Sequence, residues 1–362
     1  MADMSIALET TTVELSSLPS NESDSSAGAS SLNVHYVVWV FLLPVVVIIG
    51  VTGNVLSIIV LLSKAFRHTT TGVYLPLTAV ADIVFLLTGA QETLEVAGVF
   101  SIREHNVWTC RFYKVIFYTA GDVSIWLLVA FTFDRFIAVC FPLSKQRVCR
   151  WTRAVVASAV IASLSTAKNL HEFWTRGPEF TRSGQFRRIC GSQPEYHFFL
   201  QYVRPWIVFV VITAVPFLLI LCFNCTIVHA LIRAQRLRSA AVATPTGTGS
   251  KPPTPAASGF RQTTFMCLGI SFAFLVCVSP SIVLLIGKPY WLRDYRNIKS
   301  VCNLFGFVNH AINFFLYCVT GRRFRHQLTT MLSCRRQGTP QTPTTTQNCT
   351  SAAPTNESTR TA

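Results

Sequence analysis

Long runs of apolar residues with almost no charge recur along this sequence. Seven are found, at residues 37–62, 73–90, 115–133, 154–167, 206–232, 262–287 and 301–320. A helix needs about 20 such residues to cross the hydrocarbon core of a bilayer, and each run roughly meets that length except the fourth, which can extend toward Trp174. The runs are too long for membrane strands and lack their alternation. The sequence therefore predicts an all-α membrane protein, a bundle of seven transmembrane helices.

The composition argues against a soluble protein and against a nucleic-acid partner. Only 13% of the 362 residues are charged, too few to cover the surface of a soluble chain of this length. The net charge of +15 could suggest nucleic acid, but the bulk of it lies beside the apolar runs. Basic residues there set the orientation and contact anionic lipid. We therefore expect the lipid bilayer, and no nucleic acid, as a partner.

Basic residues also predict which helix ends are cytoplasmic. The segments after the first, third, fifth and seventh runs share one side of the bundle, and they carry many Lys and Arg residues but almost no acid. The positive-inside rule assigns them to the cytoplasm. The tail at residues 1–35 lacks Lys and Arg, as well as the basic region of a signal peptide, and is then extracellular. Its sequon makes Asn21 a candidate for glycosylation.

Two further predictions concern the chain after the seventh run. Residues 321–334 place Phe324, Leu328 and other apolar residues among arginines, which predicts a short amphipathic helix on the inner membrane surface. Cys334 there is a candidate for palmitoylation. Residues 335–362 are rich in Ser and Thr and are expected to be disordered. A loop at residues 239–259, composed mainly of Pro, Thr, Ala and Gly, is expected to be flexible.

Several polar side chains lie inside the apolar runs, where an ionisable group is costly and is therefore a functional candidate. They are Asn54 in the first run, Asp82 in the second, Ser124 in the third, and Asn309 and Asn313 in the seventh. Together they could surround a hydrated cation at the centre of the bundle, or simply hydrogen-bond to one another. The residues alone leave both alternatives open.

Short motifs stand at regular places in the runs. They are Gly53-Asn54, Leu77 with Asp82, Asp134-Arg135-Phe136 followed by Cys140-Phe-Pro-Leu, Pro216, Pro280 and Asn313-Phe-Phe-Leu-Tyr317. In order and spacing, over residues 36–332, these motifs resemble the rhodopsin-class G-protein-coupled receptors, which implies a receptor domain at residues 36–320. The sequences around Asp134, Asn169 and Tyr317 look like the FMRFamide-receptor-like branch of peptide receptors.

The resemblance implies a switch at the cytoplasmic ends of the helices. Arg135 would be held near Asp134 in the inactive receptor and released toward a heterotrimeric G protein in the active one. Phe136 and Tyr317 belong to the same switch. Arrestin would bind the phosphorylated C-terminal tail.

The resemblance also implies two sites inside the bundle and one disulfide. The polar residues would form an allosteric pocket in which Asp82 binds a sodium ion, and no other cofactor is expected. A packing switch below the ligand site, or ordinary core packing, would use Ile125, Pro216, Phe274 and Pro280.

Cys110 and Cys190 would form a disulfide according to the same resemblance, which the oxidising outer compartment permits. Cys302 has no evident partner and is expected to be free.

Three residues depart from the family pattern. Val278 stands where span six usually has Trp, Asn224 where span five commonly has the Tyr partner of the switch arginine, and Phe314 where span seven usually has Pro. The last change removes the expected cause of a kink in that helix. Altered activation is therefore left open.

Two aromatic residues narrow the ligand class. Phe117 replaces the aspartate of amine receptors, so an aminergic ligand is not expected. Phe307 replaces the lysine that binds retinal in opsins, so a Schiff base is excluded.

Acidic residues near the outer helix ends leave the charge of the ligand open. Glu92 and Glu95 could bind a basic group, such as the arginine of an amidated peptide, or form a local pair with Arg103. Asp122, deeper in span three, is a further ligand candidate. The basic second outer loop could instead attract an acidic ligand.

The sequence thus predicts a receptor of the plasma membrane that is not an enzyme. Its expected ligand is an extracellular neuropeptide, either amidated or with a free C-terminus, and its expected partner is a heterotrimeric G protein, which it activates. A seven-span transporter or channel is the alternative, but no internal repeat is found. An intramembrane enzyme would need a catalytic pair, whereas Asp82 and Asp122 are the only deep carboxylates. A receptor-like protein without G-protein signalling is a further alternative.

Overall fold

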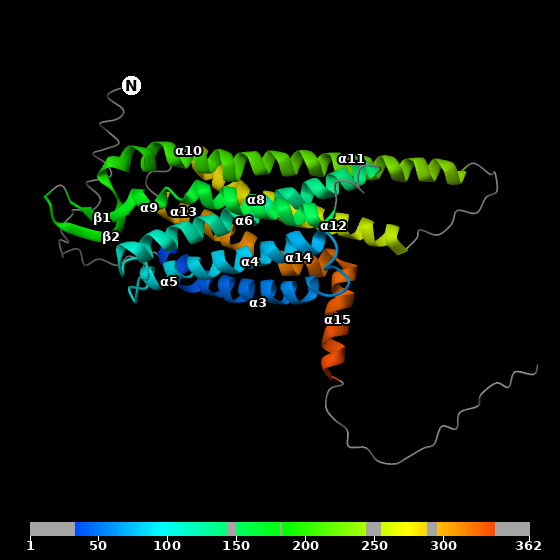
Figure 1. The fold of residues 1–362 in the computed structure, drawn as a ribbon, viewed down its shortest axis with the longest axis horizontal. Helices are drawn as coiled ribbons and strands as arrows, with labels where there is room; N and C mark the ends of the chain where they lie inside the picture. Colours follow the sequence, from blue (N-terminus) through cyan, green and yellow to red (C-terminus); the bar gives the residue numbers. More distant parts are fainter. Residues whose placement is uncertain (1–32, 143–149, 182, 244–254, 288–294, 337–362) are drawn as a thin grey trace, which may run out of the picture.

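The apolar runs form long helices that lie side by side in the computed structural model of the chain (Figure 1). The structure describes residues 33–142, 150–181, 183–243, 255–287 and 295–336. The first half contains α2 (Val34–Tyr36), a π-helical stretch (Val37–Leu42), α3 (Leu43–Leu61), α4 (Thr71–Gly89), α5 (Gln91–Val96), α6 (Val107–Cys140), α8 (Trp151–Asn169) and α9 (Glu172–Thr175). Asn21 and residues 337–362 lie outside the described residues, as do residues 244–254 of the predicted flexible loop.

The second half completes the bundle. It contains a short 3₁₀ turn (Pro194–Tyr196), a π-helical stretch (Phe199–Val203), α10 (Arg204–Val208), a second π-helical stretch (Phe209–Ala214), α11 (Val215–Ala243), α12 (Pro255–Gly287), α13 (Tyr295–Ala311), α14 (Asn313–Thr320) and α15 (Arg322–Arg336). Cys334 lies within α15, but its side chain is outside the described part. The predicted amphipathic helix after span seven is α15, which runs across the bundle axis in Figure 1.

By length and composition, four of the described helical stretches can cross a membrane: Val34–Leu61, Thr71–Val96, Val107–Cys140 and Pro194–Arg236. The bent pair α13 and α14 makes a fifth if it counts as one span, and the apolar part described in α12 is the shorter Thr264–Pro280. α8 is not among them, and its extension toward Trp174 is interrupted. The N–H of Leu170 turns back to the carbonyl of Ala167, and Trp174 falls in the separate helix α9.

α6 is the central helix, because it packs against α4, α8, α11 and α12. The larger apolar core around it includes Phe131, Phe274, Tyr317 and Phe324. Large apolar side chains also cover the outside of the described bundle, for example Ile48, Leu164 and Phe272. An apolar outer surface is costly in water and favourable in lipid, so this surface is consistent with a membrane-embedded bundle.

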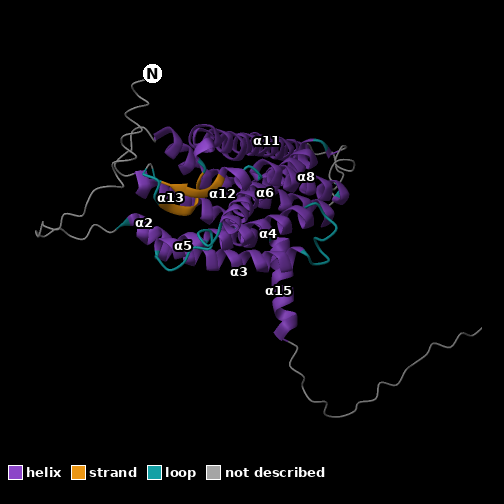
Figure 2. Ribbon diagram, turned by 60° about the vertical axis from the view of Figure 1, so that its left-hand side comes forward, coloured by secondary structure: helices purple, strands orange, loops and turns teal. Residues whose placement is uncertain are grey.

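The two ends of the bundle differ. At one end, β1 (Arg176–Phe180) and β2 (Phe186–Ser192) pair as an antiparallel hairpin whose turn contains Gly184 at φ +79°. At the other end, α15 leaves the bundle. Figure 1 shows the hairpin and α15 toward opposite ends of the bundle, and Figure 2 shows the two strands in orange and α15 projecting from the helices. These ends are called the hairpin end and the α15 end below.

Span seven bends by 51° between α13 and α14 although Phe314 replaces the usual proline. Phe314 removes the usual cause of a kink, so the bend must have another cause. In a continuous helix, the N–H of Phe314 would donate to the carbonyl of His310. That carbonyl instead accepts a hydrogen bond of 2.9 Å from Nδ2 of Asn54 in α3, and a side chain that enters the helical hydrogen-bond ladder is a known cause of kinks. A Cβ on Gly53 would lie only 2.9 Å from Cβ of Phe314, so glycine permits the close approach of the two helices.

Candidate functional site

At the α15 end, Arg135 is buried in a cluster with Asp134 and Thr70. Nη2 of Arg135 donates to Oδ2 of Asp134 and, over 2.8 Å, to Oγ1 of Thr70. Thr70 in turn donates to Oδ2 of Asp134 over 2.8 Å. The guanidinium also lies over the ring of Phe131, 5.3 Å from its centre. The sequence thus predicts the Arg135–Asp134 contact, and the structure adds Thr70, which directly precedes α4 and ties its start to α6.

The other predicted switch residues pack on either side of this cluster. The ring of Phe136 stacks on Phe223 of α11, with ring centres 5.2 Å apart. Tyr317 is fully buried and packs edge to face against Phe324 of α15 at 5.4 Å. Asn224 lies half-buried on α11. Tyr317 therefore connects the end of span seven to α15 in this state.

Asp82, fully buried in α4, gathers three polar side chains at the centre of the bundle. Its Oδ1 accepts from Oγ of Ser124 over 2.5 Å and lies 2.6 Å from Nδ1 of His310. Its Oδ2 accepts from Nδ2 of Asn313 over 2.8 Å. Asp82, Ser124 and Asn313 are therefore brought together as the sequence predicts, and His310 joins them.

Two members of the predicted polar group lie outside this contact shell. Asn54 uses its amide N–H on the His310 carbonyl, so it reaches the group only through His310. Asn309 is half-buried on α13, and its side chain makes no hydrogen bond among the described residues. A helix turns by about 100° per residue, so the neighbouring His310, rather than Asn309, points at Asp82.

An aromatic layer covers Asp82 on the side of the hairpin end. Phe85 lies against His310, with ring centres 4.1 Å apart, and stacks on Phe117 at 4.7 Å. Phe307 contacts Phe85 at 5.1 Å and Trp39 at 5.9 Å. The two residues that argued against amine and retinal ligands, Phe117 and Phe307, are thus walls of one aromatic cluster.

The four residues of the predicted packing switch lie in or beside the larger core. Phe274 is fully buried, and Ile125 and Val278 pack against the same cluster. Pro216 is buried near the start of α11, whereas Pro280 is half-buried inside α12. This arrangement is compatible with a switch and equally with ordinary core packing.

The disulfide predicted at the hairpin end is confirmed. Cys110 at the start of α6 is bonded to Cys190 in β2. Oε2 of Glu104 also accepts the backbone N–H groups of Ile189 and Cys190, over 2.7 and 3.1 Å. Cys302 is free and buried, as expected. The bond and the carboxylate together fix the hairpin to the outer end of α6.

The acidic residues proposed as ligand contacts are already paired within the chain. Arg103 contacts Oε2 of Glu95 and Oε1 of Glu92, the latter at 3.0 Å. Of the two alternatives for these carboxylates, the local pair with Arg103 is the one observed. Each carboxylate would have to leave this arginine before it could bind a basic group of a ligand.

Asp122 is a helix-to-helix contact rather than a free ligand group in this structure. Its Oδ2 lies 2.9 Å from Nζ of Lys168 and accepts from Nδ2 of Asn169 over 2.6 Å. Both partners are at the end of α8. The expectation that Asp122 lines the ligand pocket is therefore not supported, because its carboxylate is used to join α6 to α8.

Glu172 in α9 is the most heavily paired carboxylate at the hairpin end. It is completely buried, and its oxygens contact Nε of Arg176 at 2.7 Å and Nη2 of Arg204 at 2.9 Å. Burial alone would raise the pKa of Glu172, but the contact from His171 and the charges of Arg176 and Arg204 lower it to about 2. Arg204 also lies over the ring of Tyr118 at 4.3 Å. One carboxylate thus holds α9, β1 and α10 together.

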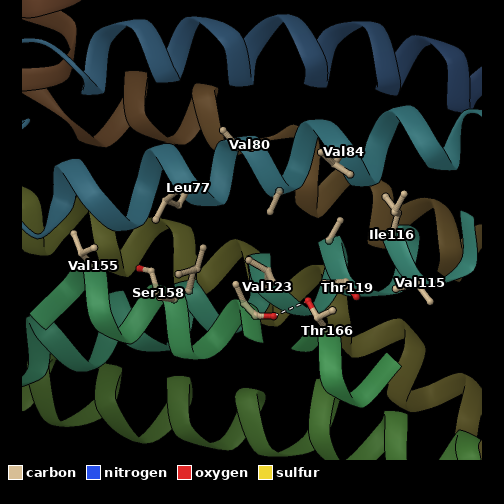
Figure 3. Close-up of a pocket in the computed structure, with 15 residues that line it drawn as sticks. Leu77, Val80, Val84, Val115, Ile116, Thr119, Val123, Val155, Ser158 and Thr166 are labelled. Atoms are coloured by element: carbon tan, nitrogen blue, oxygen red, sulfur yellow. Dashed lines mark hydrogen bonds between the residues drawn. The ribbon is translucent and has the colours of Figure 1, made fainter. Parts of the chain in front are cut away.

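A groove of about 590 Å³ lies on the side of the bundle between α4, α6 and α8, as Figure 3 shows. Apolar side chains such as Leu77, Val123 and Val155 line it, and its Thr166 donates over 2.8 Å to the carbonyl of Ala162. This groove is open to the side, and the predicted ligand residues Glu92, Glu95 and Phe117 do not line it.

Comparison with known families agrees with this architecture. A family model described as the seven-transmembrane receptor, rhodopsin family, matches residues 53–317. The chain belongs to this family. It is therefore a receptor, not an enzyme, and a multi-pass protein of the plasma membrane.

Named receptors resemble this one at low identity. The FMRFamide receptor of Drosophila melanogaster is 24% identical over 314 residues, covering 78% of this chain but only 52% of that receptor. The growth hormone secretagogue receptor type 1 of Oryctolagus cuniculus is 24% identical over 298 residues, covering 77% and 76%. The thyrotropin-releasing hormone receptor of Gallus gallus is 29% identical over 127 residues, covering 33% and 30%. The receptor thus spans about half the length of the Drosophila protein.

Sequence reasoning misses three residues of these sites. His310 carries a signal, because it is an ionisable side chain within an apolar run. Glu172 has a weaker one, since it lies four residues before Arg176, a spacing that favours ion pairs. Thr70 has none, because its contact with Asp134 depends on how α4 and α6 pack.

Proposed function

We propose that the receptor binds an extracellular peptide at the hairpin end and activates a heterotrimeric G protein at the α15 end. The peptide assignment rests on the relatives of this receptor. It resembles receptors named for FMRFamide, for a growth hormone secretagogue and for thyrotropin-releasing hormone. The N-terminus is then extracellular, and the basic α15 end faces the cytoplasm, in agreement with the positive-inside rule.

The aromatic cluster at Phe117 supports a ligand with an aromatic side chain. The carboxylates of Glu92, Glu95 and Asp122 are all paired, so they do not offer a free anion to a basic ligand group. Phe117 and its neighbours provide ring faces, and aromatic pairs contribute about 0.5–1.5 kcal/mol beyond the burial of their area. We propose that this layer is the floor of the peptide pocket.

A peptide panel tests the ligand assignment. Amidated peptides that contain Phe, together with the same peptides as free acids, are applied to cells that express the receptor, and a second messenger is measured. We expect at least one amidated peptide to elicit a response that is absent in cells without the receptor. Phe117→Ala is expected to weaken that response about tenfold, in line with the loss of one aromatic contact. A response to amines or nucleotides, with none to any peptide, would contradict the proposal.

The Arg135 cluster supports the proposed coupling to a G protein. Thr70→Val removes the hydroxyl that donates to Asp134 and accepts from Arg135, while it keeps the shape of the side chain. Loss of these hydrogen bonds destabilises the inactive arrangement by about 1–2 kcal/mol. The ratio of receptors with Arg135 released to receptors with Arg135 held in the cluster then rises about 5–30-fold. We therefore expect higher basal nucleotide exchange on the G protein in membranes that contain this variant.

Thr71→Val is the matched control for Thr70→Val. Thr71 is also buried, but no side-chain hydrogen bond is found for it among the described residues. Basal exchange should therefore stay at the wild-type level. Equal basal exchange in wild type and Thr70→Val, at equal receptor amounts, would argue against the cluster as the inactive-state restraint.

A further inference from the structure

The contacts of Asp82 can be compared with what a sodium ion would need. A hard cation prefers oxygen ligands, whose lone pairs must point toward it. Around Asp82, however, hydrogen atoms point at the carboxylate: the Ser124 hydroxyl and the Asn313 amide donate to it. Nδ1 of His310 lies 2.6 Å from Oδ1 of Asp82, within hydrogen-bond distance, so a third polar side chain contacts the same carboxyl group.

Three polar side chains therefore occupy most of the positions around the carboxyl group of Asp82. A carboxylate offers about four acceptor positions, and Oδ1 serves both Ser124 and His310 while Oδ2 serves Asn313. One buried oxygen, Oδ1 of Asn54, has no hydrogen-bond partner among the described residues. A single neutral amide oxygen does not replace the carboxylate and hydroxyl ligands that the other contacts have taken. The residues present do not fit a sodium ion.

The imidazole of His310 is held in place on several sides. The ring of Phe85 lies against it at 4.1 Å, and its side chain is almost fully buried. Its backbone carbonyl is fixed by Asn54. Rotation of the ring away from Asp82 would break the contact with the carboxylate and disturb the packing on Phe85, so the arrangement is not an incidental rotamer.

We propose that His310 takes the place beside Asp82 that a sodium ion would need, so that this receptor is not regulated by sodium. The nitrogen of a covalently attached side chain then supplies the permanent partner of the buried carboxylate. A smaller hydroxyl side chain at position 310 would withdraw this partner and leave room and an additional oxygen ligand beside Asp82.

Thermal denaturation of the purified full-length receptor tests the proposal without any ligand. Melting temperatures are compared in sodium chloride and in N-methyl-D-glucamine chloride at equal ionic strength. We expect the same melting temperature for the wild-type receptor in both salts. His310→Ser is expected to melt at a higher temperature in sodium, by about 2–4 °C, because an ion that binds only the folded state stabilises it.

Two further variants identify the site of any sodium effect. His310→Ser combined with Asp82→Asn should lose the gain in sodium, because the anionic ligand is removed. His310→Asn provides a second oxygen-bearing variant if the serine variant does not fold. Stabilisation of the wild-type receptor by sodium that disappears in Asp82→Asn would overturn the proposal. So would a folded His310→Ser receptor, and a folded His310→Asn receptor, that melt identically in both salts.

Discussion

In membranes that contain the Arg135→Ala receptor, an activating peptide is expected to bind but to drive nucleotide exchange no faster than the basal rate. Arg135 is nearly buried and is held by Asp134 and Thr70 in this structure. A guanidinium that leaves this cluster can reach a second anion or carbonyl at the α15 end, whereas alanine can make neither contact. We expect at least a tenfold loss of peptide-driven exchange, which corresponds to about 1.4 kcal/mol or more of coupling free energy.

Arg153→Ala is the matched control for this experiment. Arg153 is also an arginine near the α15 end, but it is exposed at the start of α8. It should retain peptide-driven exchange close to that of the wild type. Peptide binding is measured on the same membranes, so that a loss of fold is not mistaken for a loss of coupling. Full exchange by Arg135→Ala would exclude the proposed role of Arg135, and the family membership would stand.

Glu172→Ala is expected to cause the largest loss of stability among the substitutions considered. Glu172 is completely buried between Arg176 and Arg204, so its removal leaves two cations without their anion. Breaking a buried ion pair in this way costs about 3–5 kcal/mol. We expect a marked fall in the melting temperature of the solubilised receptor and little receptor at the cell surface.

The pKa of Glu172 indicates where this stabilisation applies. It is lowered from 4.5 to about 2, so the carboxylate stabilises the folded state fully above pH 4.5, and the contribution is lost as the pH falls toward 2. The effect is therefore complete at neutral pH.

Glu179→Ala is the control for Glu172→Ala. Glu179 also pairs with two arginines, Arg187 and Arg188, but their side chains are 55% and 48% exposed. Exposed ion pairs contribute about 0–1 kcal/mol, so this variant should melt close to the wild type. Equal falls in melting temperature for the two variants would show that burial does not determine how much these ion pairs stabilise the receptor.

Features that depend on one segment could be predicted from the sequence, and features that depend on packing could not. The helices follow from the apolar runs, and the contact between Asp134 and Arg135 follows from their being neighbours in the chain. The disulfide joins two distant segments, and only the family resemblance predicts it. The local pair of Glu92 and Glu95 with Arg103 was one of two alternatives that the sequence left open, whereas the partners of Asp122 depend on which helix end lies beside it. For the same reason the sequence predicts Asn309, and not His310, as a neighbour of Asp82. Which of the two residues points at Asp82 depends on how α13 is rotated about its axis.

The cause of the bend in span seven could not be predicted from the sequence of that span alone. Proline is one cause of a kink, and its absence from position 314 removes that cause alone. In the structure the cause lies on another helix, where Asn54 reaches the carbonyl of His310.

This origin has a consequence for motion. A proline-imposed bend is permanent, because the ring cannot restore the missing hydrogen bond. At the bend in span seven, the carbonyl of His310 accepts from Asn54, and the N–H groups of both Phe315 and Leu316 donate to the carbonyl of Ile312. Straightening of span seven would require Asn54 to release that carbonyl and the N–H groups after Ile312 to return to their i−4 acceptors. Such a change would move Tyr317 and α15 relative to α3, so the position of α15 is coupled to the packing of span one against span seven.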